Sequence, residues 1–385
     1  MNNNVSFENA LSAADNIAYL AACMVDGKKP DAERISGMDL EKLYYVAEIH
    51  KMAGIVGYAL ESAGISDPAF VQAKGKAIRK IILFDFERRK VLEELEKAGI
   101  WYMPLKGCLL KDYYPQIGMR EMADNDILYD RTRSMDVRSI MENLGFKTVK
   151  YVHDQYRHDV YQKSPVFNFE MHRALFGPVN DRLFKYYQEH LKEKMIRNEA
   201  ESCGFHLSPE DFYIYMTAHE YKHYSNGGTG LRSLLDIYVY IQKVQMDMRY
   251  VYGELEKLGM LDHEAVSRSL ALHLFGGEPL AEKEKEMLEY ILSSGAYGKK
   301  SNRLSNKIRS VGRLRTFLSR LTLPYYLMVQ NYPILIKAPV LYPFCWVHRL
   351  VYAFIFKHKI IMHELKTILT WKEKSGKKLP AHESA

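Results

Sequence analysis

Three carboxylates in this 385-residue chain have the spacing of metal ligands. Asp124 and Asp126 lie two residues apart in MADNDILYD, a run that alternates as a β-strand does, so both side chains leave the same face. Glu170 lies in FNFEMH, a second candidate strand whose apolar residues would anchor it in the same sheet. Mg²⁺ is usually bound by one or two carboxylates together with substrate phosphates, and Mn²⁺ accepts the same oxygen ligands. We therefore expect the three residues to form a site for two divalent ions beside bound phosphates.

A turn upstream of these carboxylates has the features of a phosphate-binding site. Lys106 and Gly107 follow IWYMP, a candidate buried strand, and precede CLLKDYYP, a helical stretch that ends at Pro115. Backbone N–H groups at such a turn can receive a phosphate, and glycine lets the chain approach closely. Lys106 adds a compact positive charge. Arg120 has two roles open to it, either contacting the phosphates or orienting the strand that carries the aspartates.

A competing motif lies at 219–223, where HEYKH matches the HExxH pattern of zinc peptidases. On a helix His219 and His223 fall one turn apart, where both can bind Zn²⁺, and Glu220 would act as the base. A catalytic zinc needs a third protein ligand, but the extended motif fails because position 226 is Asn and position 229 is Thr. We expect the two histidines to form part of the wall of the phosphate pocket, and a zinc-dependent peptidase is the alternative.

Three further residues complete this predicted pocket wall. His172 lies two residues after Glu170, and Arg232 and Asp236 lie one helical turn apart in GLRSLLDIYVYI. We expect Arg232 to pair with Asp236 along that helix. The preceding GGTG at 227–230 follows a helix rather than a strand, so it indicates a flexible inter-helix loop rather than a phosphate loop.

The elements that position these residues divide the chain into four parts. Residues 1–75 form short helices, residues 76–180 alternate between helix and strand, residues 181–298 are helical again, and residues 299–385 form a basic and aromatic helical tail. The alternation within 76–180, set against helical flanks, predicts an α+β fold. In it a small mixed sheet is embedded in mostly helical N- and C-terminal regions.

The composition is that of a globular protein, with 47% hydrophobic and 26% charged residues. Four scattered cysteines indicate neither a disulfide framework nor a Cys-x-x-Cys metal site. The N-terminal stretch has no basic region and contains Asp and Glu among its apolar residues, which is atypical of a signal peptide. We therefore expect a cytoplasmic protein.

The positive charge of the chain is unevenly distributed. The net charge is +7, and eight Lys and Arg residues lie between 299 and 320 with no carboxylate. Such a stretch attracts phosphates, nucleic acid or an anionic membrane surface, although a solvated helix face is the simpler explanation. The apolar tail beyond residue 321 is interrupted by four prolines, Lys337, His348 and Arg349, so it lacks the roughly 20 uninterrupted apolar residues of a membrane span. We expect a packed helical layer without a transmembrane segment, with contact to a membrane surface as the alternative.

The order of the turn, the helix and the two acidic strands resembles a largely uncharacterised group of bacterial nucleotidyltransferases in the polymerase-β-like superfamily. The matching run is LKGCLLKDYYPQIGMREMADNDILYD, with Leu105, Lys106, Gly107, Tyr114, Pro115, Arg120, Asp124 and Asp126 at the positions of the motif. FEMH resembles the following strand of that group, and HEYKH with GLRSLLDIYVYI resembles its later helical signature. The likeness covers most of residues 76–245.

The sequence departs from the wider superfamily in two places. Many relatives have Gly-Ser where this chain has Lys106-Gly107, so the grip on a triphosphate is expected to differ. The interval from Gly107 to Asp124 is longer than in minimal members, which leaves room for a remodelled pocket.

The resemblance implies a metal-dependent enzyme that moves a nucleoside monophosphate from an NTP such as ATP to an acceptor hydroxyl and releases pyrophosphate. Asp124, Asp126 and Glu170 would be catalytic and would bind Mg²⁺ (or Mn²⁺). Lys106, Gly107 and Arg120 would contact the nucleotide. A small molecule, a protein and an RNA are all open as acceptor, and a non-catalytic nucleotide-binding protein remains a further alternative.

Overall fold

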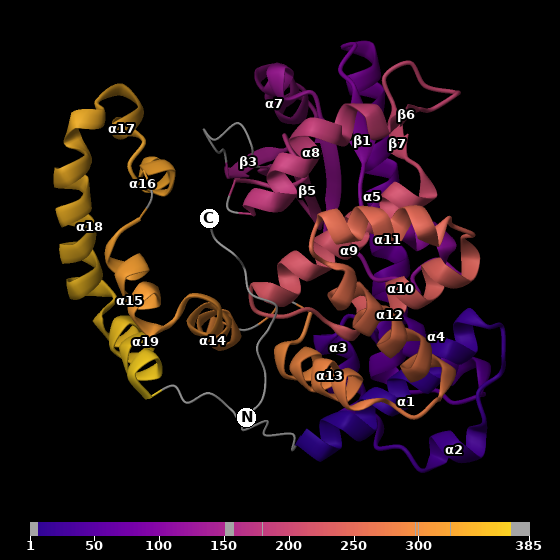
Figure 1. Ribbon diagram of the computed structural model, residues 1–385. Helices are drawn as coiled ribbons and strands as arrows, with labels where there is room; N and C mark the ends of the chain where they lie inside the picture. Colours follow the sequence, from indigo (N-terminus) through magenta and orange to yellow (C-terminus); the bar gives the residue numbers. More distant parts are fainter. Residues whose placement is uncertain are drawn as a thin grey trace.

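The computed structural model of the protein describes residues 7–150, 158–178, 180–296, 298, 300–323 and 325–370. Helices dominate these residues, and five strands form one small mixed sheet among them. Figure 1 shows the sheet with helices packed around it and, to one side, a group of helices from the end of the chain. The predicted α+β fold with helical flanks is confirmed.

The sheet places the predicted acidic strands next to each other. Its order is β1 (Tyr102–Pro104), β2 (Asn125–Tyr129), β5 (Phe167–His172), β4 (His158–Lys163) and β3 (Lys147–Lys150). β2 and β5 are parallel, and all other neighbours are antiparallel. Every residue of β2 is buried, as expected for a strand that is paired on both sides.

One hydrophobic core lies between this sheet and two helices, α5 (Pro68–Lys97) and α7 (Ser134–Asn143). α5 begins where Asp67 accepts hydrogen bonds from the N–H groups of Ala69 and Phe70, with Pro68 in its first turn. Ile81 and Phe84 of α5 are buried against the sheet. This long helix therefore fixes the position of β2 and of the residues that lead into it.

A larger core joins the N-terminal helices to those that follow the sheet. α1 packs against α10, α12 and α13, so helices far apart in the sequence form one body around the sheet. The helices of this body are α1 (Phe7–Val25), α2 (Ala32–Ser36), α3 (Leu40–Ile49), α4 (Ala53–Ser62), α8 (Asp181–Lys194), α9 (Pro209–Ser225), α10 (Leu231–Lys243), α11 (Met248–Lys257), α12 (Leu261–Gly276) and α13 (Glu282–Ser294). A short hairpin, β6 (Met195–Arg197) with β7 (Phe205–Leu207), precedes α9.

The C-terminal tail is helical, as predicted, but it does not form the expected packed layer. Its elements are α14 (Lys300–Val311), α15 (Arg313–Leu321), α16 (Tyr325–Asn331), α17 (Ile334–Lys337), a 3-10 turn at Pro339–Leu341, α18 (Tyr342–Phe356) and α19 (His358–Thr370). Figure 1 shows α15 to α19, in orange and yellow, standing to one side of the body. A small cluster of Leu304, Ile308 and Ile368 holds α14 to α19, whereas none of the described side chains of α18 is buried.

Within the described residues, the segment Pro339–Phe356 is the one helix whose length and mean hydropathy would allow it to cross a membrane. Length and composition alone are weak evidence for a span, and only 6% of that segment is buried within the protein.

Candidate functional site

The parallel pairing of β2 with β5 brings the predicted carboxylates together. Asp126 on β2 is the direct partner of Glu170 on β5, and Asp124 immediately precedes β2. Asp126 is buried, with 3% of the residue exposed, whereas Asp124 and Glu170 are half-buried. Since the three residues come from neighbouring positions of one sheet, their spacing is set by the strand register.

Lys106 contacts Asp126 directly, at the turn that the sequence singles out. Its Nζ lies 2.8 Å from Oδ1 of Asp126. Its backbone has a φ of +48°, a conformation that non-glycine residues rarely adopt, at the start of the four-residue helix α6 (Gly107–Leu110). A Cβ on Gly107 would lie only 2.6 Å from Nη1 of Arg120, so glycine is needed there for close packing. The side chain of Lys106 therefore points toward Asp126. Gly107 leaves room for the guanidinium of Arg120 to pack against the turn.

Two imidazoles complete the donor set around Glu170. Nε2 of His172 lies 2.6 Å from Oδ1 of Asp126 and 3.6 Å from Oε2 of Glu170. Nε2 of His158, on β4, lies 3.5 Å from the same Glu170 oxygen. One ligand atom from each of His158, Glu170 and His172 lies within 4.8 Å of the others, a spacing that could hold a metal ion. The sequence pointed to His172 but not to His158, whose place depends on its register opposite His172.

The pKa values of Asp124, Asp126 and Glu170 reflect their burial and the negative charge that they share. Burial and the neighbouring Asp126 raise the pKa of Asp124 to about 6, and burial with both aspartates raises the pKa of Glu170 to about 7. Burial would also raise the pKa of Asp126, but Lys106 and the hydrogen bond from His172 outweigh it and hold that pKa well below its usual range. Asp126 is thus the fixed anion of the site, and a divalent cation would relieve the repulsion among the three carboxylates.

Helix α9 brings His219 and His223, which the sequence predicted to be part of the pocket wall, near Lys106 and His172. The Nε2 atoms of His219 and His223 lie 3.1 Å apart. Burial and the charges of Lys106 and neighbouring groups hold the pKa of His219 well below its usual range. Lys222, which the sequence analysis left without a role, faces the same site. Its pKa falls to about 8 because of burial and the charge of Lys106, while Asp126 and Glu170 act in the opposite direction.

Glu220 points away from this wall. Its Oε2 lies 2.5 Å from Nε2 of His263 on α12, and both residues are buried. In an HExxH peptidase the glutamate must face the zinc-bound water between the two histidines. Because Glu220 is engaged on the opposite side, the geometry does not favour the peptidase alternative.

Arg120 and Asp236 form a buried structural pair rather than part of the pocket wall. Nε and Nη2 of Arg120 contact the two carboxylate oxygens of Asp236 at 2.7 and 2.9 Å, and the Tyr114 hydroxyl donates to Asp236 at 2.7 Å. The predicted pairing of Arg232 with Asp236 along α10 is therefore wrong. Arg232 donates instead to the carbonyl of Glu121 at 2.8 Å, where its charge lowers the pKa of Asp124 against the larger effect of burial.

A basic cavity of about 230 Å³ opens beside the residues that lead to Asp124. Lys51, Lys76, Lys80 and Arg232 line it, together with Glu48, Glu121 and Tyr44 among others. Lys80 donates to the carbonyl of Ala123 at 3.2 Å, and burial lowers its pKa. Cations therefore approach the carboxylates from α5 and α10 as well as from α9.

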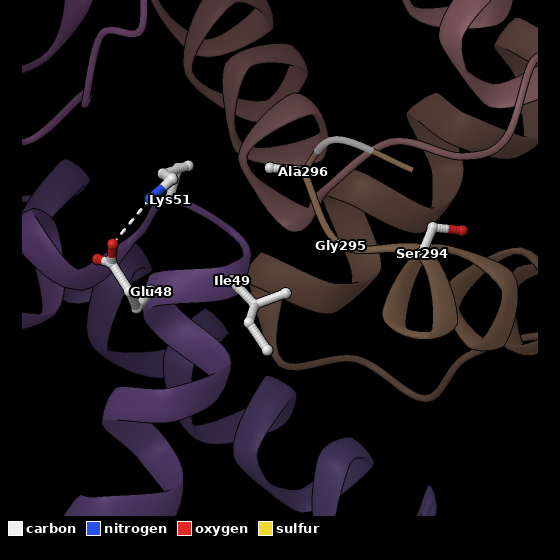
Figure 2. A pocket seen from close by; sticks show the side chains of 6 residues that line it. All are labelled: Glu48, Ile49, Lys51, Ser294, Gly295 and Ala296. Carbon is white, nitrogen blue, oxygen red and sulfur yellow. Dashed lines mark hydrogen bonds and ion pairs between the residues drawn. The ribbon is translucent and has the colours of Figure 1, made fainter. Parts of the chain in front are cut away.

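A second cavity, of about 290 Å³, shares Lys51 and Glu48 with the first (Figure 2). Figure 2 shows Ile49 on one side and Ser294, Gly295 and Ala296 on the other, with the Lys51–Glu48 ion pair at its edge. None of the candidate metal ligands lines this cavity, so we assign it no part in the site.

The GGTG loop packs against the same segment that ends α13. A Cβ on Gly228 would lie 2.0 Å from Oγ of Ser294, and one on Gly230 would lie 2.8 Å from the Cα of Ala296. These glycines serve close packing between loops, which agrees with the expectation that GGTG is not a phosphate loop.

The comparison with known families bears on the interpretation of this geometry. Residues 36–276 match the model of a family described as "Uncharacterised nucleotidyltransferase", a stretch that contains the sheet, the carboxylates and helices α9 and α10. No curated protein and no solved structure matches the chain.

Proposed function

The chain belongs to the uncharacterised nucleotidyltransferase family, and we propose that it transfers a nucleoside monophosphate from an NTP to an acceptor hydroxyl with release of pyrophosphate. The observation that carries the proposal is the β2–β5 pair, which sets Asp126 opposite Glu170 with Asp124 beside them. Phosphoryl chemistry of this kind depends mainly on positioning and on neutralising charge. A partly buried cluster of carboxylates with Lys106 and Lys222 nearby suits that demand.

The donor set fits a divalent cation. Asp124, Asp126 and Glu170 offer the hard oxygen ligands that Mg²⁺ and Mn²⁺ prefer. Burial, and after it the repulsion among the carboxylates, raises the pKa values of Asp124 and Glu170, and a bound cation would offset both effects. His158 adds a nitrogen donor, which Mn²⁺ accepts more readily than Mg²⁺ does, whereas Nε2 of His172 is engaged by Asp126 and would bind an ion only after that hydrogen bond breaks. The cation would neutralise phosphate charge and lower the pKa of the attacking hydroxyl.

The residues of the chain would divide the remaining work. Lys106 and His172 keep Asp126 ionised and in place. Lys222, on the opposite wall, is placed to contact the phosphates. Glu170 is placed to take the proton of the acceptor hydroxyl; the acceptor oxygen then bonds to the α-phosphorus while the bond to the bridging oxygen breaks and pyrophosphate leaves.

The acceptor is a small molecule, a protein or an RNA, and its hydroxyl must reach Glu170 beside the α-phosphate. An NTP donor is consistent with the cytoplasmic location that we also propose.

Double labelling of the NTP tests this function. Each of the four NTPs, labelled at the α- or at the γ-phosphate, is incubated with protein, Mg²⁺ or Mn²⁺, and cell extract as the source of acceptor. The α-label should join an acceptor and the γ-label should leave as pyrophosphate. Asp124→Asn should lose both signals, whereas Asp136→Asn, on the exposed face of α7, should keep them. Transfer of the γ-label would make the protein a phosphotransferase, and NTP binding without pyrophosphate would make it a non-catalytic binding protein.

A further inference from the structure

Helix α18 turns three of its polar side chains inward and most of its apolar side chains outward. Tyr342, Trp346 and Arg349 share one face, and all three donate to backbone carbonyls at 320–323 over distances of 2.7 to 3.0 Å. These bonds tie α18 to the end of α15 and satisfy the polar groups that would be costly to place in an apolar surrounding.

The opposite face of α18 consists mainly of large apolar side chains, with the exposed His348 among them. Phe344, Val347, Val351, Phe354 and Ile355 recur at helical spacing, and Phe344 and Phe354 are 72% and 78% exposed. A helix on the surface of a water-exposed domain has the reverse arrangement, with its apolar stripe toward the core. A contiguous exposed apolar patch of this kind marks a surface for interaction.

Basic residues outnumber acidic ones around this face, where Glu364 of α19 pairs with Arg320 over 3.3 Å. Between residues 290 and 363 the chain has no Asp or Glu and twelve Lys or Arg residues, which are Lys299, Lys300, Arg303, Lys307, Arg309, Arg313, Arg315, Arg320, Lys337, Arg349, Lys357 and Lys359. Burial and the nearby charges of Arg320 and Arg303 lower the pKa of Lys307, so cations of α14 and α15 gather in space as well as in sequence. The partner that complements this surface must be both apolar and anionic.

We propose that the tail docks the protein on the surface of an anionic lipid bilayer. The outer face of α18 would enter the boundary between headgroups and acyl chains. The basic residues of α14 and α15 would contact lipid phosphates and strengthen binding to an anionic surface. This surface role is independent of nucleotidyl transfer.

The same observations argue against other occupants. The segment Pro339–Phe356 has the length and mean hydropathy of a short membrane span, but Arg349 within it is bonded to the backbone carbonyls of Arg320 and Leu321, which ties it to the basic helix α15. A second copy of the chain would bring two basic surfaces together. A nucleic acid would match the charge but would leave the apolar face of α18 uncovered.

Vesicle sedimentation of the full chain tests the proposal. The wild type should sediment with phosphatidylcholine vesicles that contain about one third phosphatidylglycerol, and not with phosphatidylcholine alone; added salt should weaken binding. Phe344→Glu/Phe354→Glu should lower partitioning about tenfold or more, whereas Phe86→Glu, an exposed aromatic on α5, should not. Arg303→Glu/Arg315→Glu should also weaken binding, unlike the equal charge change in Lys29→Glu/Lys243→Glu.

All of these side chains are exposed, so we expect every variant to fold. A thermal unfolding curve that matches that of the wild type confirms this for each variant. Sedimentation with neither kind of vesicle would overturn the proposal. A dimer that forms without lipid and that Phe344→Glu/Phe354→Glu dissociates would also overturn it. So would RNA binding that Arg303→Glu/Arg315→Glu weakens in a protein that does not bind vesicles.

Discussion

Lys222 stands at the i+3 position from His219 on α9 and places an ammonium group near Asp126 and Glu170. Burial and the charge of Lys106 bring its pKa to about 8, so its proton is held at neutral pH and lost just above it. A lysine that binds phosphate only in its charged form makes substrate capture depend on pH.

The kcat/KM for the NTP should therefore fall as the pH rises through about 8, because the free enzyme then loses the positive charge of Lys222. Lys222→Arg keeps its charge and should remove this fall, while Lys222→Ala should lower kcat/KM about tenfold at neutral pH. Initial rates measured from pH 6.5 to 9.5 provide the check. An identical fall in the Arg variant would assign the titration to another group.

Glu220 gives a second prediction at the level of single residues. Glu220→Ala leaves the buried His263 without its partner, which should cost about 1–3 kcal/mol in the free energy of unfolding. Nucleotidyl transfer by the folded fraction should persist. Urea unfolding, zinc content and label transfer are measured for Glu220→Ala and for the control Glu189→Ala, which changes an exposed residue of α8. Stoichiometric zinc that is lost in His219→Ala would revive the peptidase alternative.

Among single residues, the sequence identified those that follow from local order and missed those that depend on register. Asp124, Asp126 and Glu170 could be predicted because alternation fixes the face of a strand. His158 could not, since it reaches Glu170 only because β4 pairs antiparallel with β5. Lys222 occupies one of the two variable positions of the HExxH pattern, so the pattern predicted no role for it.

At the level of elements, the loop that leads into β2 is held by helix α10. Arg120 in that loop is paired with Asp236 of α10, and both side chains are buried. This ion pair holds the loop that leads into β2 against α10, although 116 positions separate the two residues in the sequence. Arg120 therefore orients the aspartate strand, which was one of the two roles open to it from the sequence.

Asp236→Ala should lower the free energy of unfolding by about 3–5 kcal/mol, because it leaves a buried guanidinium without its partner. Arg120→Ala should cost a similar amount, and the double variant should lose less than the sum of the two. The KM for the NTP should stay close to the wild-type value in each folded variant. A raised KM in Arg120→Ala alone would show instead that this arginine binds phosphate.

The α+β architecture could be predicted because helix and strand periods alternate only between residues 76 and 180. The strand order could not, since β5 lies between β2 and β4 and chain order does not reveal such an insertion. The Arg232–Asp236 pairing failed for a related reason. Helical spacing allows that pair, but tertiary packing supplies Asp236 with the buried Arg120 and Tyr114, and Arg232 with a backbone carbonyl.

At the scale of the whole molecule, two helical regions distant in sequence share one core around the sheet, and the basic tail lies outside it. The body holds every residue to which we assign chemistry, whereas the tail holds the surface that we assign to lipid. We therefore assign nucleotidyl transfer to the body and docking on lipid to the tail.

The rate of pyrophosphate release from an NTP tests the central claim, nucleotidyl transfer by the body, most directly. We predict release by the wild type and by Asp136→Asn at equal rates, with a loss of at least about a hundredfold in Asp124→Asn/Asp126→Asn, because carboxylates that bind a catalytic cation contribute several kcal/mol to the transition state. Unfolding curves of the three proteins establish that each is folded. Equal release by the double variant and the wild type would contradict the account.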